Sequence, residues 1–300
     1  MPIYNLITIL GPTAIGKTRL AAQLAGHFGG EIISADSRQV YRGMDIGTGK
    51  DLKDYIIGNV QIPYHLINIV DPSEEYNLFE FIKDFTRAFS FIANHDKVPF
   101  LVGGTGLYLD AVLENYLLKV TPIDEDYHNY LNTFSLQKLQ NKLISINPVL
   151  HNTTDLLDKE RVIRAIEITV KGKNIIEKPE IKSLVIGIRL ERKALKDRIT
   201  ARLKQRLDSG MIREVERLVD EGLSFNKLNF FGLEYRYIGL YLMGKLNYNE
   251  MFQKLNSAIH NFAKRQMTWF RKMERDGIKI HWINKPDYEK AYRIIQENYF

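Results

Sequence analysis

Apolar residues follow two spacings in the first third of the chain, and each spacing predicts one kind of element. Short apolar runs predict β-strands at 4–10, 31–34, 65–70 and 98–102. Between them, apolar residues three to four positions apart predict helices over 19–28 and 78–93. Strands that alternate with helices form parallel sheets, so we expect an α/β core with helices on both faces of the sheet.

The pattern changes after residue 114. Residues 114–180 read as mostly helical, with no convincing strand. Strands return at 183–190 and 278–283, and helices are predicted over 192–219, 235–243 and 249–274 and at the end of the chain. We therefore expect one core built from 1–114 and 181–300, with a helical insertion domain at 115–180.

Composition excludes several classes of protein. A chain of 300 residues with 45% hydrophobic residues can bury a sizeable core. The absence of cysteine excludes disulfides and cysteine-based zinc sites, and no two histidines have the spacing of a helical metal site. No run approaches the roughly 20 apolar residues of a membrane helix, and the first residues lack the pattern of a signal peptide. We expect a cytoplasmic protein that does not enter a membrane.

Positive charge is concentrated in the C-terminal half. The chain has a net charge of +6, and residues 191–275 alone hold 18 Lys/Arg against 10 Asp/Glu. A basic half of this kind suits a polyanionic partner. A solvated charged face on a helix would give the same composition, and composition does not separate these two interpretations.

A phosphate-binding loop follows the first predicted strand. Residues 11–18 match G-x-x-x-x-G-K-[ST] between a strand and a helix, as this motif requires. The glycines let backbone N–H groups point at phosphate oxygens, and the helix N-terminus adds its positive end. Lys17 supplies a point charge and Thr18 a hydroxyl ligand for Mg²⁺. The motif predicts binding of a diphosphate or triphosphate.

Two further strand ends carry candidate residues. Asp36 ends the second strand, where ligands bind in open α/β sheets. It could act as a Mg²⁺ ligand, a general base or a helix N-cap. The sequence Gly103-Gly104-Thr105-Gly106 follows the fourth strand, so its backbone could approach a ligand and Thr105 offers a hydroxyl. Gly-Gly after a strand is also common in simple turns.

Four segments in this order and spacing resemble the tRNA dimethylallyltransferases. They are 11–18, 34–48, 103–108 and 263–271. The resemblance spans nearly the whole chain, and the second segment is not shared by P-loop kinases at large. It implies a P-loop NTPase-like parallel sheet core flanked by helices, with an all-helical insertion that grips the anticodon arm of tRNA.

The resemblance also implies a reaction. A dimethylallyl group would pass from dimethylallyl diphosphate to N6 of the adenosine 3′ of the anticodon, with Mg²⁺ as cofactor and diphosphate as leaving group. Asp36 would be the general base, Thr13 the phosphate-loop threonine, Thr105 a residue at the reacting centre, and Arg202 a holder of the leaving diphosphate. The diphosphate-binding set would be Gly11, Thr13, Ala14, Ile15, Gly16, Lys17, Thr18 and Arg202.

Helical spacing gives the proposed role of Arg202 independent support. Arg198, Arg202 and Arg206 recur every four residues beside an apolar stripe, so they share one face of a helix. An inward-facing arginine would stabilise the charge that grows on a leaving diphosphate. For Arg206 a solvated basic face remains a good interpretation.

Contacts with tRNA are predicted by basic residues beside aromatic ones, which suit phosphates and unpaired bases. The resemblance places these contacts on Asp36, Ser37, Arg38, Gln39, Thr105, Glu160, Arg161, Arg164, Lys264, Arg265, Gln266, Trp269 and Arg271. Trp269 and its neighbour Phe270 could equally be core residues. A monomer is expected.

The chain departs from the family pattern at two positions. Glu234 stands where the family usually has glycine, and His128 stands where an arginine is expected early in the insertion. Both departures concern the choice or affinity of tRNA more than the reaction. Alternative hypotheses are a small-molecule P-loop kinase, an enzyme that prenylates free adenine nucleotides, and a non-catalytic RNA-binding protein.

Overall fold

The computed structural model describes residues 3–116, 119–120, 124–148, 156, 158–172, 174–175 and 179–300. The chain divides into two compact units. The first, called the core unit below, consists of Met1–Glu114 and Glu180–Phe300, and the second, the insertion unit, is Asn115–Pro179. No helix within the described ranges combines the length and the apolar character that crossing a membrane requires.

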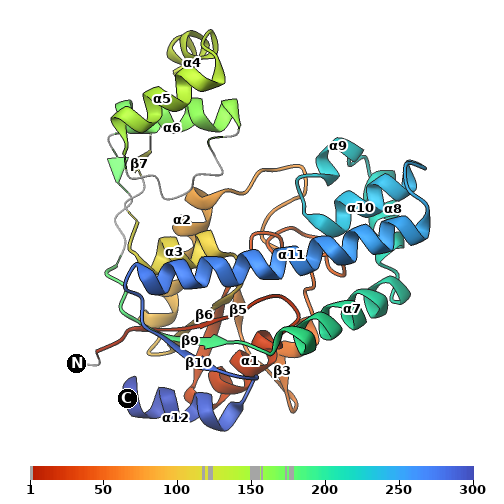
Figure 1. The fold of residues 1–300 in the computed structure, drawn as a ribbon. Helices are drawn as coiled ribbons and strands as arrows, with labels where there is room; N and C mark the ends of the chain where they lie inside the picture. The colour runs from red at the N-terminus through yellow and green to blue at the C-terminus, as the bar shows by residue number, and fades with distance from the viewer. Residues whose placement is uncertain are drawn as a thin grey trace. The chain divides into compact units, whose positions relative to one another are not determined.

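One parallel sheet organises the core unit (Figure 1). Its strands are β1 (Leu6–Leu10), β2 (Gly30–Ala35), β5 (Tyr64–His65), β6 (Val98–Gly103), β9 (Ser183–Ile188) and β10 (Ile280–Ile283). They lie in the order β10-β9-β1-β6-β2-β5, and every neighbouring pair is parallel. The predicted P-loop-like α/β fold is confirmed. Strand β1 is buried throughout because both faces of the sheet are covered, which explains its continuous apolar run.

Helices cover the sheet on both faces. The helices of the core unit are α1 (Lys17–Phe28), α2 (Leu78–Asn94), α3 (Gly106–Leu113), α7 (Arg192–Asp208), α8 (Met211–Asp220), α9 (Phe225–Leu228), α10 (Leu233–Leu242), α11 (Tyr248–Arg275) and α12 (Tyr288–Asn298). A short 3₁₀ helix, Leu52–Tyr55, precedes the hairpin of β3 (Ile56–Ile57) and β4 (Val60–Gln61). Helices α1 and α12 lie on one face, and α2, α3 and α11 on the other.

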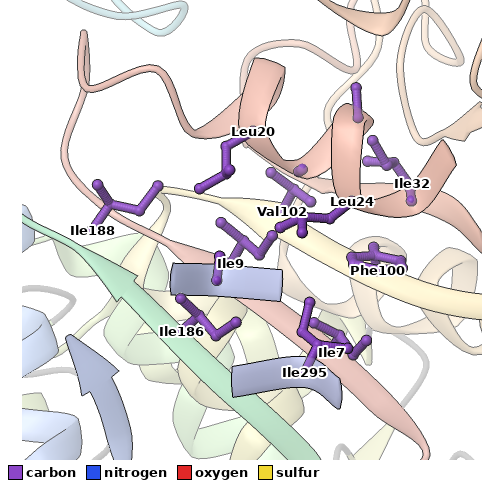
Figure 2. Close-up of a cluster of buried hydrophobic side chains, with 14 of the residues drawn as sticks. Ile7, Ile9, Leu20, Leu24, Ile32, Phe100, Val102, Ile186, Ile188 and Ile295 are labelled. Carbon is purple, nitrogen blue, oxygen red and sulfur yellow. The ribbon is translucent and has the colours of Figure 1, made fainter. Parts of the chain in front are cut away.

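A large hydrophobic cluster lies between the sheet and the helices α1 and α12 (Figure 2). Ile7 and Ile9 of β1 pack against Leu20 and Leu24 of α1, and Ile295 of α12 closes the same layer. All five side chains are almost fully buried. Burying side chains of this size stabilises the fold by about 1.5–3 kcal/mol each. This layer fixes the start of α1 against the end of β1, where the phosphate-binding loop lies.

Two predicted elements differ from the structure. The strand expected over 65–70 is present only as Tyr64–His65, because Leu66 and Asn68 adopt left-handed backbone with φ of 64° and 57°. The single helix expected over 192–219 is divided at Gly210, whose φ of 98° no helix accommodates. Two helices therefore lie in place of one, and α8 changes direction.

The insertion unit has its own small core. Its helices are α4 (Glu125–Asn132), α5 (Leu136–Ile146) and α6 (Lys159–Lys171), and two residues each of β7 (Lys119–Val120) and β8 (Asn174–Ile175) pair antiparallel. The expectation of no strand in this region is corrected by that short pairing. Side chains of the three helices form a buried cluster: Leu131, Leu139, Leu143, Val162, Ile163 and Ile166.

Candidate active site

The carboxyl ends of three neighbouring strands bring the predicted site residues together. The phosphate-binding loop follows β1, Asp36 follows β2, and Thr105 lies just after β6, which is paired with both. The Thr105 N–H donates to the carbonyl of Ala35 at 3.2 Å, and the Thr105 hydroxyl accepts from the N–H of Ser37 at 3.1 Å. The second and third loops are thus joined, with Thr105 beside Asp36.

The phosphate-binding loop has the backbone of an anion site. Ala14 and Gly16 adopt left-handed conformations with φ of 61° and 90°, and α1 begins at Lys17 with no side-chain cap at its N-terminus. The first N–H groups of a helix have no partner within the helix, and the helix dipole is positive there. An anion at this position would receive both the N–H groups and the dipole.

Gln266 of α11 joins the phosphate-binding loop to the loop after β6. Its Oε1 accepts from the N–H of Thr13 at 2.9 Å, and its Nε2 donates to the carbonyl of Gly104 at 2.8 Å. A Cβ at Gly104 would overlap the Gln266 amide, so the contact needs glycine there. Gln266 is buried, and both ends of its amide hold loops in place. Its predicted tRNA contact stays a prediction; its bridging role was not foreseen.

Lys17 projects from the loop into a partly buried, positively charged environment. Burial lowers the pKa of Lys17 from 10.5 to about 8; Asp36 opposes this shift, while the cations Arg202 and Arg206 add to it. Among the described residues, the Lys17 ammonium donates one hydrogen bond, a long one of 3.4 Å to the carbonyl of Pro12. A cation kept short of partners among other cations is a binding group for an anion.

Asp36 keeps one carboxylate oxygen available. Its Oδ1 accepts from the N–H of Arg38 at 2.9 Å, and its other oxygen accepts no hydrogen bond from the described part of the chain. Residues 37–40 form turns and not a helix, so the interpretation of Asp36 as a helix N-cap was wrong. General base and metal ligand remain as its candidate roles.

Helix α7 presents three arginines toward the same region. Arg198 donates to the carbonyl of Ile15 in the phosphate-binding loop at 3.2 Å. Arg202 forms an ion pair with Asp51 at 2.5 Å and donates to the carbonyl of Gly49 at 3.5 Å. The interpretation of Arg206 as part of a solvated face was wrong, because its side chain is only 13% exposed.

A buried carboxylate fixes the segment that follows Asp36. Glu214 of α8 accepts from the backbone N–H groups of Asp45, Ile46 and Gly47 at 2.7–2.9 Å and from the Tyr235 hydroxyl at 2.7 Å. Sequence reasoning missed this residue. The signal was a glutamate on the apolar stripe of α8, whose buried members are Met211, Glu214, Val215 and Leu218. A charge on an apolar stripe indicates an internal partner.

Replacing Glu214 with alanine is expected to lower the free energy of unfolding by about 3 kcal/mol or more, because the buried Gly47 N–H and Tyr235 hydroxyl and two partly buried N–H groups lose their acceptor. The measurement is chemical denaturation followed by circular dichroism. Glu216→Ala on the same helix is the matched control, since Glu216 is exposed, and it should change stability by less than about 0.5 kcal/mol. Equal stability of the two variants would contradict the role given to Glu214.

The predicted RNA-contact residues of the core unit divide by exposure. Lys264, Arg265 and Arg271 are exposed on α11, whereas Phe270 is buried in the core. Trp269 is half-buried, and its ring packs on Gly106 at the start of α3, next to Thr105. The predicted contacts after Asp36 are engaged within the unit. The Arg38 guanidinium lies 4.7 Å from the ring centroid of Phe230, and Gln39 donates to the Gly49 carbonyl at 3.4 Å.

In the insertion unit, a buried carboxylate organises the predicted tRNA residues. Glu167, not predicted, contacts the His128 ring at 2.9 Å and accepts from Arg164 at 2.9 Å. The second ring nitrogen of His128 lies 3.3 Å from Glu160. Arg161 is exposed on the same helix, α6. His128 therefore links α4 to α6, and this contact gives the histidine a structural role within the insertion unit.

Comparison with known proteins shows which family the chain resembles in sequence. The profile of the family described as IPP transferase matches residues 39–273, and that of the isopentenyl transferases matches residues 4–62. A tRNA dimethylallyltransferase 1 of Geotalea uraniireducens is 56% identical over 281 residues, which cover 93% of this chain and 92% of the relative. The tRNA dimethylallyltransferase 1 of Syntrophus aciditrophicus is 54% identical and covers 98% of both chains.

A solved structure agrees with these relatives. The full-length tRNA isopentenylpyrophosphate transferase of Bacillus halodurans superposes with a TM-score of 0.70 at 35% identity, covering 98% of this chain and 95% of that one. Fold, motif order and sequence identity over nearly the full length agree. The chain belongs to the IPP transferase family.

Proposed function

We propose that this protein transfers a dimethylallyl group from dimethylallyl diphosphate to N6 of the adenosine 3′ of the anticodon in tRNA, and releases diphosphate. The observation that carries the proposal is the convergence of Lys17, Asp36 and Thr105 at the ends of three adjacent strands, with Arg202 turned to the same region. An anion site and a carboxylate with a free oxygen thus lie together in a member of a prenyl-transferring family.

The chemistry needs a strong electrophile, because an adenine amine is a poor nucleophile. The bond between the allylic carbon and the diphosphate oxygen breaks, its electron pair leaves with diphosphate, and N6 forms the new bond to that carbon. The loop N–H groups, Lys17 and Arg202 stabilise the charge that grows on the diphosphate. Asp36 takes the proton from N6, with Thr105 beside it and Thr13 in the phosphate-binding loop. The base must leave its stack to reach this site.

Magnesium fits the residues present. The hydroxyl of Thr18, in the first turn of α1, makes no hydrogen bond within the described residues. Mg²⁺ prefers few protein ligands and completes its shell with phosphate oxygens and water, which matches a site without three clustered acidic or histidine side chains in the described part of the chain. Thr18 would hold the ion, which would neutralise charge on the departing diphosphate.

Docking of tRNA is assigned to exposed cations. Lys264, Arg265 and Arg271 line the exposed side of α11, and the insertion unit, through α6, would grip the anticodon arm. With diphosphate bound at the start of α1 and RNA bound along α11, the flipped base would meet the prenyl donor near Thr105 and Trp269. That the donor is dimethylallyl diphosphate, that the cofactor is Mg²⁺ and that the enzyme is a monomer remain predictions.

Radiolabelled dimethylallyl diphosphate with Mg²⁺ tests the proposal when bulk tRNA, free AMP, and ADP or ATP are offered in parallel. Label in tRNA alone is the expected result. Label in the free nucleotides would move the protein to nucleotide prenylation, and no label in any acceptor would favour a P-loop kinase.

The pKa of Lys17 makes binding of diphosphate dependent on pH. The ammonium is charged below about 8 and loses its proton as the pH rises above that value. We expect the affinity for inorganic diphosphate to fall above pH 8, by at most about tenfold per pH unit. Calorimetric titration from pH 6.5 to 9.5 measures it. The Lys17→Arg variant stays charged over this range, so its curve of affinity against pH reports the titration of diphosphate alone. If the wild-type curve ran parallel to that of the variant, the prediction would be contradicted.

A further inference from the structure

Arg206 is buried with most of its hydrogen-bonding capacity unused. Its Nη1 lies 3.9 Å from Oε1 of Glu234, an ion-pair distance but not a hydrogen bond. Its Nε and Nη2 are buried and have no hydrogen-bond partner within the described residues. These two nitrogens form one edge of the guanidinium, whose parallel N–H groups match two oxygens of a phosphate or carboxylate.

The charge of Arg206 acts on the phosphate-binding loop. The Arg206 guanidinium lies on Gly49, where a Cβ would collide with it, and Gly49 also contacts Arg202. Both arginines lower the pKa of Lys17, so their charges act on the phosphate-binding loop. Burial, with the neighbouring charge of Arg202, lowers the pKa of Arg206 itself to about 10. Arg206 is still a cation at neutral pH, and burying it is costly while its Nε and Nη2 make no hydrogen bond within the described residues.

Each of the two arginines faces a carboxylate of its own. Arg202 pairs with Asp51, and Arg206 faces Glu234. Glu234 stands at the first turn of α10. Its side chain is 19% exposed, and its burial raises its pKa while Arg206 lowers it. The arginine opposite it offsets part of the cost of burying this carboxylate.

We propose that Arg206 is a second diphosphate-binding arginine and that Glu234 competes with the diphosphate for it. The inference rests on the proposed function, since it names a further residue of the same anion site. In the unliganded protein Glu234 is the resting partner of Arg206, held too far away for a hydrogen bond. When diphosphate binds, its oxygens take the unused Nε–Nη2 edge and the attraction of Arg206 to Glu234 is weakened.

This arrangement has a functional consequence. An internal anion that repels diphosphate lowers affinity for the donor and for the product alike, and so hastens product release. A residue without a carboxylate at this position would remove the competitor. Glu234 would therefore shift the enzyme toward weaker binding and faster release of diphosphate, which is a property of the diphosphate side of the site.

The test is calorimetric titration of the full-length protein with inorganic diphosphate and Mg²⁺. Glu234→Gln is expected to tighten binding by about threefold to tenfold, the range of a moderate ion pair. Arg206→Met is expected to weaken binding by about tenfold or more. In the double variant Glu234→Gln should give no further gain, because its effect passes through Arg206. Glu216→Gln, exposed on α8, is the control and should leave the affinity unchanged.

Unchanged or weaker binding in a folded Glu234→Gln protein would overturn the competition, and unchanged binding in Arg206→Met would overturn the arginine's role. Thermal unfolding of each variant establishes folding, and Glu234→Gly supplies a second variant with the same expected gain. The titration uses neither tRNA nor prenyl transfer. Failure of the proposed function would appear as absent label in tRNA, with the diphosphate titration still informative.

Discussion

Replacing Asp36 with asparagine is expected to lower the rate of prenyl transfer by roughly 10²–10⁴-fold, the usual contribution of a general base. Asparagine keeps the size of the side chain and can still accept from the N–H of Arg38 through its oxygen, so the turn after β2 is preserved. What it loses is the capacity to take a proton from N6. Single-turnover transfer from labelled donor, at saturating tRNA, measures the loss directly.

Binding of tRNA separates this role from a structural one. Asp36→Asn and Asp36→Ala should both retain most of their affinity for tRNA in a filter-binding assay, while transfer is abolished in the alanine variant. Asp54→Asn, a substitution of another acidic residue of the core unit, serves as the matched control for the chemical change. Near-wild-type turnover in Asp36→Asn would remove Asp36 from the role of base.

Replacing Arg202 with alanine is expected to lower kcat/KM for the prenyl diphosphate by roughly 10²–10³-fold, as removal of a preorganised charge-stabilising group does elsewhere. Arg202 is one of the cations whose charge reaches Lys17, so its loss leaves the leaving diphosphate less stabilised. Steady-state kinetics with the donor varied at saturating tRNA gives the ratio. Arg202→Lys should recover only part of the loss, because a lysine cannot offer two parallel N–H groups.

Lys204 offers the control for this helix. It is exposed on α7, two residues from Arg202, and Lys204→Ala changes the net charge by the same amount. Its kcat/KM for the donor should stay within about twofold of wild type. If Arg202→Ala and Lys204→Ala lose activity equally, the effect belongs to the overall charge of α7 and not to a contact with diphosphate.

The parts of this protein that the sequence predicted well are those set by neighbours in the chain. The strands β1, β6 and β9 are continuous apolar runs. Such runs predict a parallel sheet that is buried on both faces, because side chains on both sides of each strand must be apolar. The phosphate-binding loop is similar, since its glycines and the helix that follows determine the backbone. The strand expected over 65–70 failed for a local reason too, since left-handed residues such as Leu66 end the pairing and no apolar pattern reports φ.

The parts that were missed depend on distant partners. Gln266 touches loops at Thr13 and Gly104, more than 160 residues away along the chain. Glu214 accepts from a segment 167–169 residues earlier. The spacing of Arg206 along its helix is compatible with an exposed position. Its guanidinium is buried because Gly49, which is distant in the sequence, packs against it. Helical periodicity gives the face on which a residue lies, but not the element that covers the face.

Helix α11 carries a consequence for how the two substrates are aligned. Gln266 touches the phosphate-binding loop, and Arg271, five residues later, is exposed for RNA on the same continuous helix, about 7.5 Å farther along its axis. The distance between the diphosphate contact and this RNA contact is therefore set by the rise of one helix. A shift of α11 would move both contacts together. Inserting one residue between Gln266 and Arg271 would rotate Arg271 by about 100° about the helix axis relative to Gln266, while leaving Lys264, Arg265 and the loop contact in place.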